Sequence, residues 1–117
     1  MARRYALNYD WARRGPVRWT EESSVTLRVD LTSAGDAVWE ALTGWWSGMP
    51  REAGVAYSGG CCFPAPVRLS EGAVTAWITS SGEDAFDSVA HHAEELRGVA
   101  EAADPSVTVT WTELPLE

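Results

Sequence analysis

The chain has 117 residues and a net charge of −8, and 45% of its residues are hydrophobic and 22% are charged. These values predict one globular domain, residues 1–117. A domain of this size can fold without a disulfide or a metal. No stretch is apolar enough to span a membrane, and no apolar run follows Arg3 and Arg4 as in a secretory signal. Two cysteines without a spacing pattern do not indicate a secreted disulfide framework, so we expect a cytoplasmic protein without membrane contact. All nine basic residues are Arg, which is typical of a high-GC genome, such as that of an actinobacterium or its phage.

Residues 1–20 differ from the rest of the chain in charge and in aromatic content. Five Arg against one Asp give this segment a charge of +4, whereas four Arg against sixteen acids give the remainder −12. Tyr5, Leu7, Tyr9 and Trp11 alternate, which predicts a strand within a basic, aromatic N-terminal hairpin or extended arm. Arginine beside aromatic residues can bind single-stranded nucleic acid, but the acidic remainder opposes this, and we expect no nucleic-acid binding.

The other elements follow from periodicity and from capping and turn residues. Residues 24–32 alternate apolar and polar side chains and predict a strand. A helix follows, capped by Thr32 or Ser33 and ended by Gly48 and Pro50. A long loop is expected over 50–65, and it can hold a short strand at 54–58. A hairpin of residues 67–70 and 73–80 turns at Glu71-Gly72. It is followed by a helix over 83–103 and a strand over 106–113.

After the N-terminal arm, this order is β-α-β-β-α-β. It predicts an α+β ferredoxin-like sandwich, in which two helices cover one face of an antiparallel sheet. Alternation within the strands leaves the other face polar and rich in threonine around one large indole. The residues expected on this face are Thr26, Arg28, Asp30, Thr75, Trp77, Thr79, Thr108, Thr110 and Thr112.

The two cysteines, Cys61 and Cys62, are adjacent and lie between two glycines and a proline-broken run. Neighbouring Cα atoms lie about 3.8 Å apart, closer than the roughly 4.4–6.8 Å of ordinary disulfides, so we expect two free thiols. A reactive thiol requires a base or a positive charge beside it, and the nearest basic residue in the sequence is Arg68. The pattern favours two small side chains packed in a tight loop, with reactive thiols as the alternative.

Asp87, His91 and Glu95 recur every four residues on one face of the second predicted helix. Such a row can bind a divalent metal, but three ligands on one straight helix reach a single ion poorly, so a solvated face is favoured. The chain also lacks a zinc motif, a glycine-rich phosphate loop and a Ser-His-Asp order. We therefore expect no metal, no cofactor and no enzymatic activity.

The seven tryptophans provide more aromatic surface than a small core must hold, which predicts that some of them lie at a contact surface. We expect this surface where the first helix ends and the long loop follows, with one of two adjacent indoles as the anchor. The alternative is that the helix end simply packs on the loop. The expected contact residues are Trp45, Trp46, Met49, Tyr57 and Phe63.

The threonine-rich face offers a competing contact at Trp77. We expect aromatic residues of the N-terminal arm to cover this indole, which would leave the end of the first helix as the available surface. The candidates for that cover are Tyr5, Tyr9 and Trp11.

Acidic charge, surplus tryptophan and the missing catalytic motifs together predict a non-catalytic protein–protein interaction domain, such as an inhibitor, an immunity protein or an accessory protein. Its partner would be another protein with a basic surface, or a second copy in a homodimer. Two alternatives remain open. One is a structural self-assembling subunit that associates through the threonine-rich face or a free sheet edge. The other is a small thiol-dependent enzyme or ligand sensor that uses Cys61 or Cys62.

Overall fold

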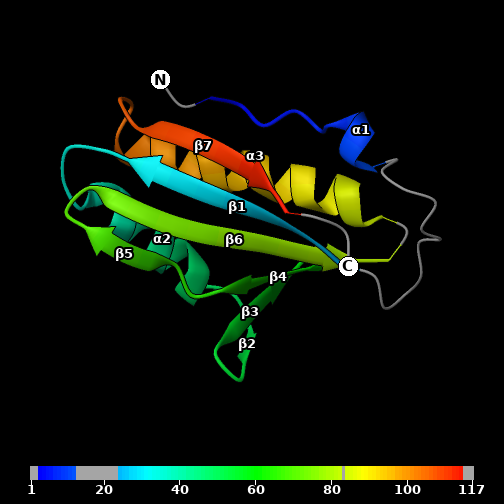
Figure 1. The fold of residues 1–117 in the computed structure, drawn as a ribbon. Helices are drawn as coiled ribbons and strands as arrows, with labels where there is room; N and C mark the ends of the chain where they lie inside the picture. The colour runs from blue at the N-terminus through cyan, green and yellow to red at the C-terminus, as the bar shows by residue number, and fades with distance from the viewer. Residues whose placement is uncertain (1–2, 13–23, 83, 115–117) are drawn as a thin grey trace.

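The computed structural model describes residues 3–12, 24–82 and 84–114, which build a seven-stranded antiparallel sheet with helices on one side (Figure 1). Neighbouring strands follow the order β2-β3-β4-β6-β1-β7, and β5 pairs with β6 on the same side as β4. In chain order the elements are α1 Tyr9–Ala12, β1 Ser24–Thr32, α2 Ala37–Ser47, β2 Arg51–Glu52, β3 Val55–Ser58, β4 Cys61–Pro64, β5 Val67–Ser70, β6 Ala73–Ser81, α3 Ala85–Ala103 and β7 Thr108–Glu113.

The centre of the sheet is formed by β1 and β6, which pair without a break from Ser24↔Ser81 to Thr32↔Ala73. The alternation predicted for β1 is confirmed, because every second side chain is buried. Burial of these apolar side chains removes them from water and drives the packing of the helices on this side. The residues of β1 that take part are Val25, Leu27, Val29 and Leu31.

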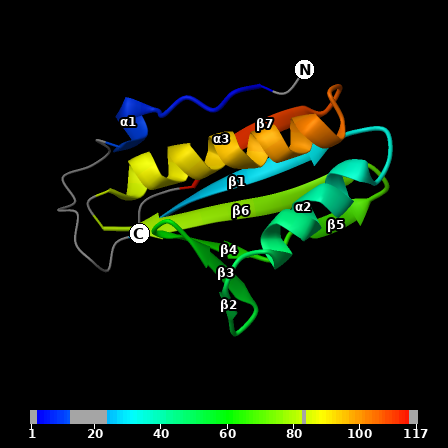
Figure 2. The ribbon, with the colours of Figure 1, turned by 180° about the vertical axis from the view of Figure 1, so that it is seen from behind.

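Both long helices, α2 and α3, cover the same face of the sheet, as the view from behind shows (Figure 2). Each helix turns an apolar row toward the core: Val38 and Leu42 in α2, and five apolar residues of the longer α3. The α3 row includes Val89, Ala93, Leu96 and Ala100, all fully buried. No described helix covers the opposite face of the sheet, which we call the open face (Figure 1).

The expected ferredoxin-like β-α-β-β-α-β sandwich is wrong, because the sheet has seven strands and the described chain has three helices. Much of the difference lies in residues 50–65, which contain the three short strands β2, β3 and β4 in place of a long loop. Gly54, Gly59 and Gly60 have positive φ angles of 79°, 49° and 83°, which let the chain turn back between these strands. Each strand is too short to show a period in the sequence.

The hairpin of β5 and β6 is confirmed, with Gly72 in its turn at a φ of 80°. A Cβ atom on Gly72 would lie 2.1 Å from the carbonyl oxygen of Ser33, and the Ser33 N–H donates to the Gly72 carbonyl at 2.8 Å. The turn therefore packs directly on the chain that leaves β1. Glycine is required here by both the backbone angle and the close approach.

The strand expected in the N-terminal arm is also wrong. Residues 3–8 are extended and run beside β7, and the chain then forms the short helix α1 (Figure 1). The Asn8 side chain caps this helix by accepting the N–H groups of Asp10 and Trp11. Trp11 is fully buried against Phe86 of α3, with ring centroids 4.9 Å apart. The rest of the predicted hairpin, residues 13–20, lies outside the described residues.

Candidate functional site

The contact surface predicted around the end of α2 is divided between the two faces of the sheet. On the helix side, the Trp46 indole N–H donates to the carbonyl of Phe63 at 2.8 Å, and Trp45 packs edge-on against the buried Phe63 ring. Trp45 also donates to Glu95 of α3 at 2.8 Å. Both indoles and Met49 are partly buried against the core. This arrangement matches the alternative prediction, in which the helix end packs on the following segment.

Tyr57 and Trp77, the other two predicted contact residues, lie on the open face. The strand register places Tyr57 beside Cys62, Cys62 beside Thr79, and Trp77 beside Arg28. The aromatic cover expected for Trp77 is not found among the described residues of the arm. Trp11 packs on α3, and Tyr5 packs on Trp111 of β7 with ring centroids 5.5 Å apart.

The open face carries most of the exposed large apolar side chains of the described chain. Tyr57 is 47% exposed, Val67 42% and Leu69 65%, and the fourth such residue is Tyr9 in α1. Trp77 is partly exposed beside them. Leu69 and Trp77 line a hollow of about 270 Å³ together with Arg28 and Thr75. Exposed apolar groups on one rigid face are typical of a contact surface.

The open face is nearly neutral, although the whole chain is acidic. On strands β1, β5, β6 and β7 its charged side chains are Arg28 and Asp30, which form an ion pair at 3.0 Å, and the register of β2 adds Glu52 opposite Val55. Asp30 also accepts a hydrogen bond from Thr75 at 2.8 Å. By contrast, the helix side carries many acids, and those of α3 and its flanks include Asp84, Asp87, Glu94, Glu95 and Glu101. The acidic side chains are thus concentrated on the helix side of the molecule, whereas the open face carries few charges.

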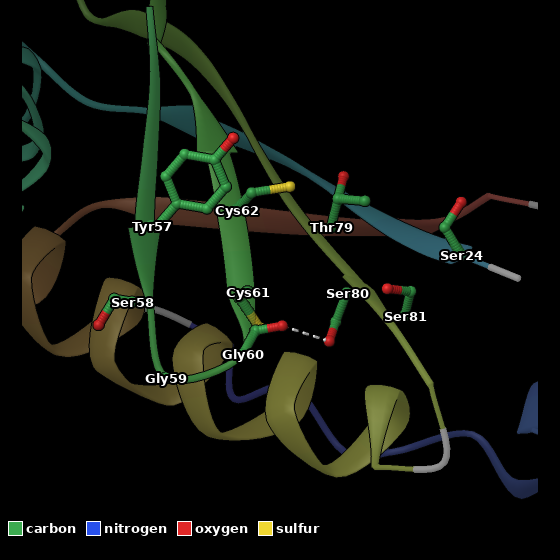
Figure 3. Close-up of a pocket in the computed structure, with 10 residues that line it drawn as sticks. All are labelled: Ser24, Tyr57, Ser58, Gly59, Gly60, Cys61, Cys62, Thr79, Ser80 and Ser81. Carbon is green, nitrogen blue, oxygen red and sulfur yellow. Dashed lines mark hydrogen bonds between the residues drawn. The ribbon is translucent and has the colours of Figure 1, made fainter. Parts of the chain in front are cut away.

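A second hollow, of about 600 Å³, opens where the β3–β4 turn meets the end of β6 (Figure 3). The Cys62 side chain points into it between Tyr57 and Thr79, and serines line its far end (Figure 3). Ser80 donates its hydroxyl to the carbonyl of Gly60 at 2.8 Å and so fixes the turn to β6. The hollow is continuous with the open face through Tyr57 and Thr79.

The two thiols point to opposite sides of β4, and both are free. Burial raises the pKa of the Cys61 thiol to about 11, although the neighbouring Ser80 side chain opposes this shift, and burial also raises the pKa of Cys62. A nucleophilic thiol needs the opposite shift, which a nearby cation or helix N-terminus produces. The geometry at this turn therefore favours packing over thiol chemistry.

The row of Asp87, His91 and Glu95 lies on the outer side of α3. Glu95 already accepts the indole N–H of Trp45. Within the described residues, no group of three His, Cys, Asp or Glu side chains is close enough to hold a metal ion. The neighbouring His92 is buried and donates its Nδ1–H to the Ser88 carbonyl at 2.8 Å, which is a structural role.

Val67 and Leu69 were not among the predicted contact residues. In a strand of four residues, alternation alone does not show which side chains are exposed. In the structure the register shifts between Arg68 and Ser70, so Val67 pairs with Thr75 and both lie on the face that carries Trp77. A regular hairpin around the predicted turn would instead pair Val67 with Ala76 and Leu69 with Val74 on the buried face, so only the register shift brings these side chains to the open face.

Comparison of the chain with protein-family models, with curated proteins and with solved structures finds no match. None of the helices in the described part of the chain has the length and apolar character to cross a membrane. The geometry of the two faces of the sheet therefore carries the information about function.

Proposed function

We propose that this chain is a non-catalytic protein-binding domain that docks its partner on the open face of the sheet. The observation that supports the proposal is the gathering of Tyr57, Val67, Leu69 and Trp77 on one rigid surface. Aromatic anchors surrounded by smaller apolar side chains account for much of the binding energy at protein interfaces. The raised thiol pKa values support the absence of catalysis at Cys61 and Cys62.

The open face also indicates what the partner surface would be like. It is nearly neutral and carries rows of threonine beside the apolar residues, so it fits an uncharged, apolar patch better than the basic surface expected from the net charge. The acidic helix side would remain in water and keep the domain soluble. In this proposal the domain acts in the cytoplasm as an inhibitor, an immunity protein or an accessory protein.

Site-specific photo-crosslinking in the native host tests this proposal. Benzoylphenylalanine replaces Leu69 on the open face in one variant and the exposed Ala102 of α3 in a matched control. We expect one discrete crosslinked protein from the Leu69 position and none from the Ala102 position. Crosslinks from the Ala102 position alone would contradict the proposal, and crosslinks between copies of this chain would favour the self-assembling subunit.

The crosslinked protein is then purified, and its affinity for this domain is measured directly. Leu69→Ser should weaken binding at least roughly tenfold, because it removes an exposed apolar contact and does not alter the core. Trp46→Phe should leave the affinity unchanged, since Trp46 faces β4 on the other side of the sheet. Equal losses in the two variants would place the contact elsewhere.

A further inference from the structure

The N-terminal arm and the edge strand β7 enclose a groove at one edge of the sheet, and the strands β2–β4 lie toward the opposite edge. The groove has a volume of about 340 Å³ and is lined by Arg3, Arg4, Tyr5, Ala6, Asn8, Val109, Thr110, Trp111 and Glu113. Figure 1 shows the arm extending along β7 before it reaches α1. A volume near 300 Å³ is at the small end of the range for ligand sites, so the groove suits a short segment.

The hydrogen bonds between residues 3–8 and β7, as far as the described residues show them, use side chains of β7. The Trp111 indole donates to the carbonyl of Arg3 at 2.8 Å, and Glu113 accepts the Tyr5 hydroxyl at 2.6 Å and the Asn8 amide at 2.9 Å. Within the described residues, no backbone hydrogen bond joins residues 3–8 to β7, which pairs only with β1. The arm therefore runs beside β7 but does not hydrogen-bond the backbone N–H and C=O groups at the outer edge of this strand.

The register shows which backbone groups of β7 face the groove. Leu114 N–H donates to the Thr26 carbonyl, so Thr112, Thr110 and Thr108 of β7 direct their N–H and C=O groups toward β1. The residues between them, Val109, Trp111 and Glu113, direct theirs away from the sheet. The strand sequence TVTWTE also lacks the proline, lysine or bulge that usually protects an edge.

The wall formed by the arm is positively charged, unlike most of the molecule. Arg3 has no ion-pair partner among the described residues, and Arg4 is 74% exposed while it contacts Glu94 at 3.3 Å. The acid in the groove, Glu113, already accepts hydrogen bonds from Tyr5 and Asn8. The groove therefore places the positive charge of Arg3 and Arg4 beside a strand edge whose outward backbone groups have no hydrogen-bond partner among the described residues.

We propose that this groove binds an extended acidic segment of a partner protein, which adds to β7 as a further strand and places a carboxylate beside Arg3 and Arg4. Backbone pairing supplies affinity in this mode of recognition, and the side-chain contacts supply selectivity. From Val109 to Glu113 the edge is about 13 Å long, enough for four or five residues of the bound segment. A second copy fits less well, because two chains of −8 repel each other and β7 offers no acid beyond Glu113.

Nuclear magnetic resonance titration of the ¹⁵N-labelled full chain tests the proposal. The probes are two pools of capped octapeptides in which either Glu or Lys alternates with varied apolar residues, and a third pool of Glu peptides with N-methylated backbones. We expect the Glu pool to shift the amides of Val109 and Trp111 and the Trp111 indole. The Lys pool and the N-methylated pool should have little effect, since one lacks the carboxylate and the other lacks the strand donors.

Charge reversal at the arm provides the matched test. Arg3→Glu should weaken binding of the Glu pool at least roughly tenfold, whereas Arg51→Glu, the same change on the distant strand β2, should not alter it. Leu69→Ser should also leave this binding intact, which separates it from the open face. The proposal is wrong if no pool shifts β7 at millimolar concentration, if the Lys or N-methylated pool binds equally well, or if sedimentation shows that β7 pairs two copies of the chain.

Discussion

The imidazole of His92 lies directly against the backbone of Gly59. A Cβ atom at residue 59 would lie 2.8 Å from Cε1 and 3.0 Å from Nε2 of the ring. The ring cannot move aside freely, because it is buried, bonded to the Ser88 carbonyl and packed against Phe63 at a centroid distance of 5.3 Å. This contact holds the β3–β4 turn against α3.

Gly59→Ala should therefore destabilise the domain by about 2–3 kcal/mol, from a strained positive φ together with overpacking against His92. Gly54→Ala is the matched control, because Gly54 also has a positive φ but has open space around it. The control should cost only about 1 kcal/mol. Urea unfolding of both variants measures the difference, and equal losses would show that the contact with His92 is unimportant.

Gly72→Ala should be at least as damaging as Gly59→Ala, with a loss of roughly 3 kcal/mol or more. The added methyl group would meet the Ser33 carbonyl, a backbone atom that is itself held by the hydrogen bond from Ser33 to Gly72. Thermal and urea unfolding check this value. A loss no larger than that of Gly54→Ala would contradict the packing described for this turn.

The buried Cys61 thiol should make the stability of the domain depend on pH in the alkaline range. Burial raises its pKa from 9.0 to about 11, so the folded chain keeps the thiol neutral at a pH where the unfolded chain ionises it. This contribution is fully present below pH 9 and is lost as the pH rises from 9 to 11. The free energy of unfolding should fall across this range more steeply in the natural chain than in Cys61→Ala.

Urea unfolding at about pH 8 and about pH 10.5 measures both slopes. Some slope should remain in Cys61→Ala, because burial also raises the pKa of Tyr5 and its hydroxyl follows the same sign. Identical slopes in the two proteins would mean that Cys61 is ionised as easily in the folded chain as in the unfolded one.

Trp46→Phe should lower the free energy of unfolding by about 1 kcal/mol, because it leaves the Phe63 carbonyl without its indole donor. Leu69→Ser should change stability by less than about 0.5 kcal/mol, since Leu69 is mostly exposed. Unfolding experiments on the two variants thus separate a packing residue from a contact residue. A larger loss for Leu69→Ser would show that its side chain supports the fold.

The elements that were predicted correctly either have a repeating pattern of apolar residues or contain a residue that the local backbone conformation requires. Val25 to Leu31 alternate over a full strand, the α3 row repeats at helical spacing, and Gly72 marks its turn. The short strand expected at residues 54–58 is present as β3, but β2 and β4 were missed because they have two and four residues and are stabilised by pairing with their neighbours. Their number changed the fold class.

The candidate site was predicted less well, for a related reason. Trp45 and Trp46 were expected at a surface, but whether an indole is covered depends on Phe63 and Glu95, which are distant in the sequence. Alternation of Tyr5 and Trp11 suggested a strand, but the Asn8 cap begins a helix between them. The cover of the indoles depends on tertiary contacts, which override local propensity. The Asn8 cap, by contrast, is a local signal that the sequence contained and the alternation of Tyr5 to Trp11 obscured.

The pairing of β1 with β6 has a consequence for how fast the chain reaches its native state. It joins residues roughly 40 to 60 positions apart, whereas the β3–β4 and β5–β6 hairpins close over a few residues. Local hairpins form within microseconds, but the central pair must first overcome the entropy of closing a long loop. The slow events in folding should therefore be the long-range pairings of β1 with β6 and with β7, which place this small domain among millisecond-to-second folders.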